Sequence, residues 1–334
     1  MARLLSVLDH KMPWMEIAAL EQRLRDRPGD LASWRAYGDW LSERGDARGA
    51  LIRLEQRRAR VGAVEREALE REFAALVKEH QEGWDAALPT GATVVERRYG
   101  FATKVAIEWS EGAPVLIEQA LRGPFVTALR VTAPAQEDYW DESFFDDDGE
   151  PLPASNVEAG ALATLNLARL TELDLSYLRI GALGAKALAV SMYLRSDAES
   201  LATLAGSGAP GGSSGDAQQR IEALDLRYSH IGNSGLAALA EAPFFGGIRR
   251  LRLQSNAITA AGVSSLHRFE GLAELDLRYN AIGAEGVQAL LAAPFIGSLK
   301  RLLLYREDVG DDGARTLARA PQLPPALRSY WRSV

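Results

Sequence analysis

Leucine and isoleucine recur at fixed spacing through the second half of the chain. In five segments, two of these residues lie three positions apart and a third follows two positions later. This spacing places alternate apolar side chains on one face of a short strand. A further isoleucine or valine and a Gly-x-x-Ala-Leu-like stretch then give one apolar face to a helix. The five strand segments are 170–175, 221–226, 248–253, 272–277 and 299–304.

The regular recurrence of this unit predicts a stacked array. From residue 221 the strand segments begin 27, 24 and 27 residues apart. One such unit cannot bury its own apolar face, so neighbouring units must stack to form a continuous core. A weaker first copy covers 126–131. Before it, alternation predicts a strand over 100–107 and apolar spacing predicts a helix over 115–121, and we expect 92–125 to cap the array.

The repeat resembles leucine-rich repeats of the helix-containing type found in ribonuclease inhibitor and in the Ran GTPase-activating protein. The resemblance covers roughly residues 120–325. It implies an α/β solenoid with parallel strands on a concave face and helices on a convex face. Two repeats, at Asn256 and Asn280, carry the asparagine that bonds the backbone in this family. The other three repeats have Leu178, Ser229 and Glu307 at this position. We therefore expect an incomplete asparagine ladder.

A different, all-α pattern occupies residues 1–55. Asp30 follows a Pro-Gly break and is a predicted N-cap for a helix. The stretch 28–30 together with 38–46 resembles a short bacterial module, the repeat-companion domain, which accompanies leucine-rich and other repeats. This resemblance implies a bacterial repeat protein but no particular reaction or ligand. Residues 56–91 are predicted to form a charged connecting helix.

Two insertions interrupt the predicted solenoid, which we place at 126–334. The first, at 136–156, is acidic. The second, at 193–220, lengthens its repeat to 51 residues and contains a glycine- and serine-rich run at 206–216. This composition is typical of a flexible loop. A phosphate-binding loop would need a preceding strand and a following Lys-Ser or Lys-Thr pair, and the run has neither.

The net charge of −7 is concentrated in one segment. Residues 136–158 hold nine acidic and no basic side chains, and the rest of the chain is nearly neutral. An acidic chain argues against nucleic-acid binding through phosphate neutralisation. Cysteine is absent from the sequence, which excludes disulfides and thiolate chemistry. The N-terminal apolar run is broken at Asp9, and no stretch approaches the ~18 apolar residues that span a bilayer. We expect a cytoplasmic protein without a membrane partner.

The sequence has no catalytic motif in the structural context that its chemistry requires. The four histidines have no metal-binding spacing, and neither a Gly-x-Ser-x-Gly elbow nor a nucleotide-binding glycine motif follows a strand. The run from Asp146 to Gly149 invites an EF-hand interpretation, but its register puts Phe144 and Ser155 at ligand positions. We therefore expect no enzyme, no cofactor and no metal.

The acidic insertion also contains four aromatic side chains. Aromatic rings can anchor a protein partner while the acids steer a basic surface toward them. Alternatively, the rings cover the open edge of the first repeat, and the two interpretations can hold together. The candidate binding residues of the insertion are Tyr139, Trp140, Asp141, Phe144, Phe145, Asp146, Asp147 and Asp148.

The outward positions of the strands predict a polar concave face. Asp225, Arg252 and Asp276 fall on adjacent strands and are expected to alternate in sign across the sheet. Such a face is either a solvated sheet surface or a recognition surface. The candidate partner-binding residues there are Arg227, Arg252, Arg278 and Tyr305, which are of the types enriched at binding hot spots.

These observations favour a non-enzymatic protein that binds another protein. It would act as an adaptor, a regulatory subunit or the recognised substrate of a partner enzyme. Two alternatives stay open. One is an accessory regulator of an enzyme such as a small GTPase, by analogy with the Ran-activating relatives. The other is a self-assembling structural solenoid.

Overall fold

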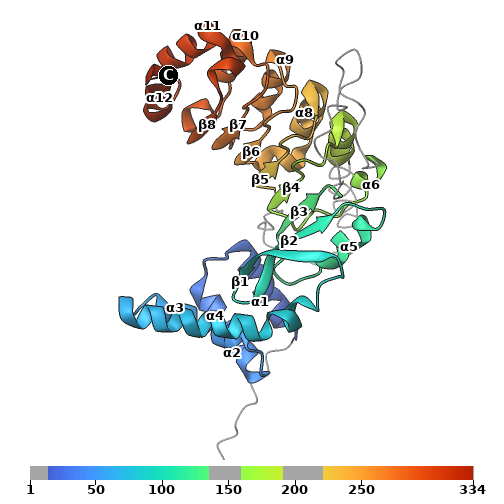
Figure 1. Ribbon diagram of the computed structural model, residues 1–334, viewed down its shortest axis with the longest axis vertical. Coiled ribbons are helices and arrows are strands. Elements are labelled where there is room, and N and C mark those ends of the chain that lie inside the picture. The colour runs from blue at the N-terminus through green and yellow to red at the C-terminus, as the bar shows by residue number, and fades with distance from the viewer. Residues whose placement is uncertain (1–13, 135–158, 191–220, 334) are drawn as a thin grey trace, which may run out of the picture. The chain divides into compact units, whose positions relative to one another are not determined.

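The computed structural model of the 334-residue chain describes residues 14–134, 159–190 and 221–333 (Figure 1). The chain divides into two compact units. The first comprises residues up to 89 together with 94–103 and 123–125. The second comprises 90–93, 104–122 and the residues from 126 onward. No helix among the described residues is long and apolar enough to cross a membrane.

Four helices form the main part of the first unit. They are α1 (Trp14–Asp26), α2 (Leu31–Glu43), α3 (Arg48–Arg58) and α4 (Ala63–Asp85). The predicted cap at Asp30 is confirmed, because its side chain accepts hydrogen bonds from the backbone N–H groups of Ala32 and Ser33 at 3.1 and 3.2 Å. The helical content agrees with the all-α pattern that the sequence predicts here.

An aromatic cluster forms the core of this unit. Trp34 lies at its centre, with ring centroids 4.8 Å from Tyr99 and 5.0 Å from Phe125. Aromatic pairs at such separations and tilts stabilise a core beyond the burial of their area. Four side chains of α4 pack against the cluster, namely Phe73, Leu76, Val77 and Trp84. The charged helix therefore contributes part of the core.

One sheet runs through the chain, with its strands side by side in sequence order. The strands are β1 (Ala92–Arg98), β2 (Phe101–Glu108), β3 (Ala128–Thr132), β4 (Glu172–Asp174), β5 (Ala223–Asp225), β6 (Arg250–Arg252), β7 (Glu274–Asp276) and β8 (Arg301–Leu303). From β2 to β8 every neighbouring pair is parallel. Each predicted strand is present, including the weaker first copy and the strand before it.

The helices of the second unit follow its strands. They are α5 (Ala113–Ala120), α6 (Ala159–Ala163), α8 (Gly232–Glu241), α9 (Ala260–Val263), α10 (Gly283–Leu291), α11 (Arg306–Arg319) and α12 (Pro325–Ser333), with a further helical segment at 181–190. Three short 3₁₀ turns, η2 (Pro243–Gly247), η3 (Ser264–Arg268) and η4 (Ile296–Ser298), lead into the next strands. Figure 1 shows β5 to β8 on the inner side of an arc and α8 to α11 on its outer side.

Buried leucines hold the strands in register. The middle leucine of each repeat lies opposite that of the next, as Leu251 does opposite Leu275. Both are 1% exposed. Aligned leucines in adjacent repeats bury the apolar face that a single repeat would leave in water, which is the stabilising principle of a solenoid.

Side chains at the asparagine position link neighbouring repeats. The side-chain amide of Asn256 donates to the carbonyl of Leu226 at 2.6 Å, and that of Asn280 donates to the carbonyl of Leu253 at 2.9 Å. Ser229 makes the equivalent bond through its hydroxyl, 3.0 Å from the carbonyl of Leu175. The asparagine ladder is incomplete, as expected, but the hydroxyl of Ser229 supplies the bond in this repeat, which the repeat pattern does not predict.

The last repeat also departs from the prediction. Asp308, one residue beyond the predicted Glu307, accepts the backbone N–H of Asn280 at 3.2 Å and that of Tyr305 at 2.6 Å. Because a carboxylate accepts but cannot donate, it receives the bond from the preceding repeat and caps α11 as well. The ladder thus runs from Ser229 to Asp308.

Candidate functional site

Three outward positions on each strand make up the concave face. On β6 and directly after it these are Arg250, Arg252 and Gln254, while Leu251 and Leu253 are buried in the core. The strand register aligns equivalent positions, so each position forms a row that crosses the sheet. The middle row runs through Arg130, Asp174, Asp225, Arg252, Asp276 and Leu303.

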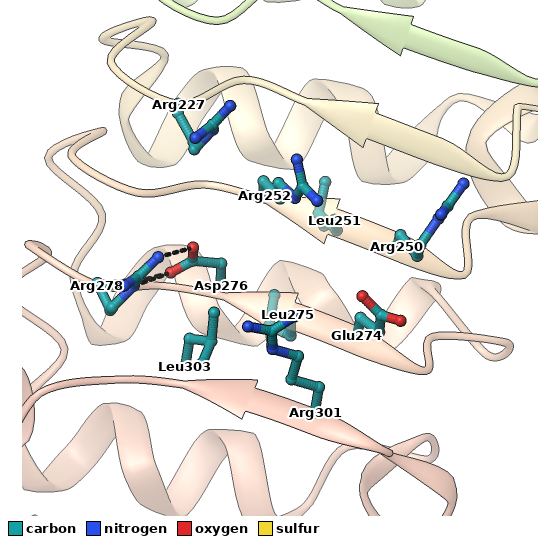
Figure 2. Close-up of a pocket in the computed structure, with 10 residues that line it drawn as sticks. All are labelled: Arg227, Arg250, Leu251, Arg252, Glu274, Leu275, Asp276, Arg278, Arg301 and Leu303. Carbon is teal, nitrogen blue, oxygen red and sulfur yellow. Dashed lines mark hydrogen bonds and ion pairs between the residues drawn. The ribbon is translucent and has the colours of Figure 1, made fainter.

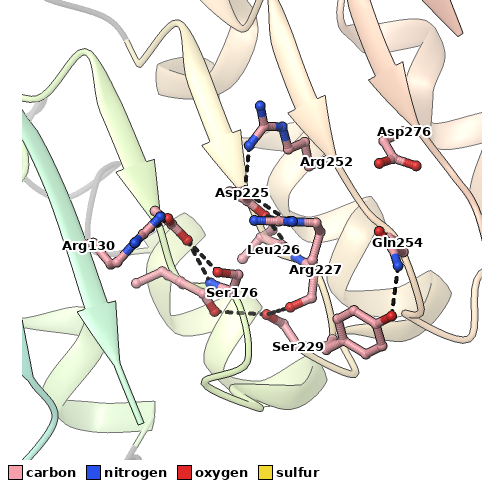
Figure 3. A network of polar contacts seen from close by, with 12 residues as sticks. Arg130, Ser176, Asp225, Leu226, Arg227, Ser229, Arg252, Gln254 and Asp276 are labelled. Carbon is pink, nitrogen blue, oxygen red and sulfur yellow. Dashed lines mark hydrogen bonds and ion pairs between the residues drawn. The ribbon is translucent and has the colours of Figure 1, made fainter. Parts of the chain in front are cut away.

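The three aspartates of the middle row are almost fully buried, each 7% exposed or less. Arg130 donates to Asp174 at 2.7 Å, and Ser176 donates to the same carboxylate at 2.7 Å (Figure 3). Burial alone would raise the pKa of Asp174. The hydrogen bonds from Ser176 and Arg130 outweigh this effect and hold the pKa below its usual range. The carboxylate is therefore charged at neutral pH and satisfied by its neighbours.

The strand register places Asp225, Arg252 and Asp276 in the predicted alternation of charge, but only one of the two neighbouring pairs forms a hydrogen bond. Asp225 lies opposite Arg252, and Arg252 lies opposite Asp276. Arg252 donates to Asp225 at 3.1 Å. Asp276 is instead bonded by Arg278, two residues further along its own repeat, through two side-chain nitrogens at 2.9 and 2.7 Å.

The same local pairing occurs one repeat earlier. Arg227 donates to Asp225 at 2.8 Å through its side chain and at 3.2 Å through its backbone. An Asp-Leu-Arg sequence in both repeats places the two charges two residues apart on one face of a strand. The Asp-Leu-Arg motif in the sequence therefore indicates this pairing within one repeat, in addition to the pairing between strands.

A shallow hollow lies on the concave face over β5 to β8 (Figure 2). Its lining residues are Arg227, Arg250, Leu251, Arg252, Glu274, Leu275, Asp276, Arg278, Arg301 and Leu303. Three of the predicted site residues, Arg227, Arg252 and Arg278, thus come together in one place. Two further arginines, Arg250 and Arg301, join them and were not predicted. Five guanidinium groups and two lining carboxylates make the hollow positively charged.

The arginines in this hollow differ in how fully they are paired. Arg227 and Arg278 are held by buried aspartates. The side chains of Arg250 and Arg252 are each 50% exposed and each has one ion pair, to Glu172 at 3.4 Å and to Asp225 at 3.1 Å. Within the described part of the chain, Arg301 has no ion pair. These three guanidinium groups keep N–H donors available to a ligand.

Tyr305, the fourth predicted residue of the concave face, lies beside the hollow. Its ring centroid is 5.7 Å from the guanidinium carbon of Arg278, within the range of a cation–π contact. Its ring also meets that of Tyr279, with centroids 5.1 Å apart. Tyr305 is 37% exposed and Tyr279 is 57% exposed.

The other predicted site residues belong to the acidic insertion. They lie outside the described residues and are Tyr139, Trp140, Asp141, Phe144, Phe145, Asp146, Asp147 and Asp148. Among the residues that the structure describes, no three histidine or acidic side chains are grouped to hold a metal ion. His267 contacts the carbonyl of Ala289 at 2.8 Å, which gives it a structural contact between helices.

Comparison with protein families supports the repeat assignment. Four segments match a family model described as leucine-rich repeat, at residues 168–189, 219–240, 248–266 and 272–291. They contain β4, β5, β6 and β7 with the helices that follow. A comparison with curated proteins found no match.

Proposed function

We propose that this leucine-rich-repeat protein is a non-enzymatic interaction protein that binds a protein partner through the concave face of its solenoid. Leucine-rich repeats generally mediate protein–protein interaction, and a stacked array offers a large, rigid concave surface. The observation that carries the proposal is the gathering of five arginines in one hollow beside exposed tyrosines. Arginine and tyrosine are enriched at the energetic centres of interfaces.

The acidic-aromatic insertion is the second proposed contact region. Its acids would steer a basic part of the partner, and Tyr139, Trp140, Phe144 and Phe145 would supply apolar anchors. In this proposal the protein serves as an adaptor, a regulatory subunit or the recognised substrate of a partner enzyme. We further propose that it is a bacterial, cytoplasmic protein and that residues 1–55 form a repeat-companion module. The resemblance of 28–46 and the absence of cysteine support these two points.

Affinity capture with matched variants tests this function. The first variant, R250Q/R252Q/R301Q, removes three exposed charges from the hollow. Its fold is expected to persist, because Glu172 keeps its ion pair with Lys104 and Asp225 keeps Arg227. The control variant, R268Q/R315Q/R319Q, removes three exposed arginines from η3 and α11 and changes the net charge equally.

A third variant, Y139S/W140S/F144S/F145S, removes the rings of the insertion. A partner that is captured by the wild type and the control but lost with the first or third variant supports the proposal and locates the contact. If no partner depends on either region, the protein does not bind through these surfaces. Light scattering across a concentration series then tests the structural solenoid alternative.

A further inference from the structure

A row of tyrosines follows the carboxyl ends of the strands, next to the arginine hollow. Tyr177, Tyr228 and Tyr279 stand at equivalent positions after β4, β5 and β7, with φ of 65°, 55° and 56°. Ser255 takes this position after β6, also with positive φ. Tyr305, at the position after β8 that Arg278 takes after β7, extends this aromatic surface and contacts Tyr279.

Local backbone preference does not explain the choice of tyrosine. Left-handed φ is costly for a bulky side chain, whereas glycine or asparagine adopts it readily. Three tyrosines nevertheless take this conformation, and the rings of Tyr177 and Tyr279 are exposed, at 44% and 57%. Part of the cost is offset within the row. Tyr177 stacks on Tyr228 with centroids 4.7 Å apart, and the hydroxyl of Tyr228 accepts from Gln254 at 2.7 Å.

The tyrosine row and the arginine hollow run in the same direction, across the strands. The row contributes aromatic surface along the carboxyl-end margin, and Arg250, Arg252 and Arg301 contribute exposed positive charge across β6 to β8. A ligand that satisfies both must therefore combine acidic groups with apolar ones along its length. An extended polypeptide does so when acidic and apolar residues alternate, because successive side chains point to opposite sides.

The carboxylates within the hollow argue against a continuous polyphosphate. Glu274 and Asp276 line the hollow together with the arginines, and the whole chain carries a net charge of −7. A nucleic-acid backbone, with a charge on every nucleotide, would be brought against these carboxylates. A peptide can place its few carboxylates opposite the arginines alone.

We propose, on the basis of the proposed function, that this surface binds an extended, acidic peptide segment of a protein partner. The peptide runs across the sheet from β4 to β8. Its acidic side chains pair with Arg250, Arg252 and Arg301. Its alternate, apolar side chains contact the exposed rings of Tyr177, Tyr279 and Tyr305. Guanidinium–carboxylate pairing supplies charge-assisted hydrogen bonds, and the tyrosines supply apolar contact area.

Selection from a random-peptide display library on the full chain tests the chemistry of the ligand directly. We expect enriched sequences in which Asp or Glu alternates with aromatic or apolar residues. An enriched peptide is then synthesised with a fluorescent label, and its affinity is measured by anisotropy. The R250Q/R252Q/R301Q variant should bind it at least tenfold more weakly, while R268Q/R315Q/R319Q should bind it as the wild type does.

A second variant separates binding from folding. Y177N/Y279N replaces two exposed rings by a residue that favours left-handed φ, so its melting temperature should be equal to that of the wild type or higher. Its affinity for the labelled peptide should nonetheless fall several-fold. Added salt should weaken binding to the wild type and have less effect on the triple arginine variant.

Several results would overturn the proposal. Enrichment of basic or uncharged peptides would overturn the proposal of an acidic peptide ligand. The proposed function would nevertheless survive this result if a protein partner that binds the concave face were captured. Tighter binding of a short single-stranded DNA that competes with the peptide would assign the surface to nucleic acid. If the peptides bind the D146N/D147N/D148N variant but not the wild type, the chain's own acidic segment competes for the surface and is its ligand. A selection that enriches no peptide sequence would also contradict the proposal of an acidic peptide ligand.

Discussion

The side chain of Asn280 binds the backbone of Asn256 in the neighbouring repeat. Its amide oxygen accepts the backbone N–H of Asn256 at 3.0 Å and that of Ile258 at 2.9 Å. Its amide nitrogen donates to the carbonyls of Leu253 and Leu277, both at 2.9 Å. One buried amide thus satisfies backbone groups in two repeats, where no regular secondary structure does so.

Replacing this amide should destabilise the array. Asn280→Ala leaves several buried backbone groups without partners, and we expect a loss of about 3 kcal/mol, given ~1–3 kcal/mol for each unsatisfied group. Urea unfolding followed by circular dichroism measures the change. Gln288→Ala, at an exposed position of α10, serves as the control and should stay within about 0.5 kcal/mol of the wild type. Equal effects of the two substitutions would contradict the role of Asn280.

The end of the ladder can be tested at two adjacent residues. Asp308→Ala removes the acceptor for the N–H groups of Asn280 and Tyr305, and we expect a loss of about 2 kcal/mol. Glu307→Ala changes an exposed side chain and should have an effect within about 0.5 kcal/mol. A larger fall in the urea midpoint for Glu307→Ala than for Asp308→Ala would show that Glu307 ends the ladder, as the repeat pattern predicts.

Acid should weaken the concave face through Asp174. Because hydrogen bonds hold its folded pKa below the unfolded value, the unfolded chain takes up the proton first as the pH falls. The stability that this group contributes is complete above about pH 4, the ordinary pKa of aspartate, and is lost as the pH falls through its depressed folded pKa. Unfolding free energies measured across this range should show a steep acid limb.

The matched variant for this experiment is Asp174→Asn. Asparagine does not titrate and keeps an acceptor for Ser176, so the acid limb should become shallower, while stability at neutral pH falls with the loss of the Arg130 ion pair. An unchanged acid limb would show that other carboxylates cause the acid sensitivity.

Close helix stacking should make Gly286 intolerant of a methyl group. A Cβ atom there would lie 2.6 Å from Cγ2 of Ile282 and 3.2 Å from Cα of Ala260 in the preceding repeat. Since backbone cannot yield as a flexible side chain does, Gly286→Ala should cost about 1–3 kcal/mol. Gly271→Ala is the control, because its nearest neighbour would be 3.9 Å away, and it should be neutral or slightly stabilising. Thermal melting of both variants decides the comparison.

The apolar spacing was sufficient to predict the strands and their register. Leu224, Leu251 and Leu275 each align with the next because only one register buries all of them. The ladder was harder to predict at Ser229 and Asp308. A hydroxyl or a carboxylate can take over from an amide when the backbone offers the right donor or acceptor, and this depends on geometry that the residue type does not reveal.

The site could be predicted only in part for a similar reason. Arg227, Arg252 and Arg278 stood out as outward-facing arginines, and they do line one hollow. The sequence pattern also turns Arg250 and Arg301 outward, but it does not show which guanidinium groups are already paired. The apolar spacing does not predict the tyrosine row, because the residue after each strand is not part of that spacing. Its signal in the sequence is the recurrence there of Tyr-x-x-Ile or Leu-Arg-Tyr.

The sheet is continuous across the longest gap in the repeat spacing. Leu173 lies opposite Leu224 in β4 and β5, 51 residues further along the chain, in the same register as repeats half that length apart. Sheet pairing here depends on which repeats are neighbours and not on the length of chain between them. Lengthening the chain between β4 and β5 should therefore leave the pairing of Leu173 with Leu224 unchanged.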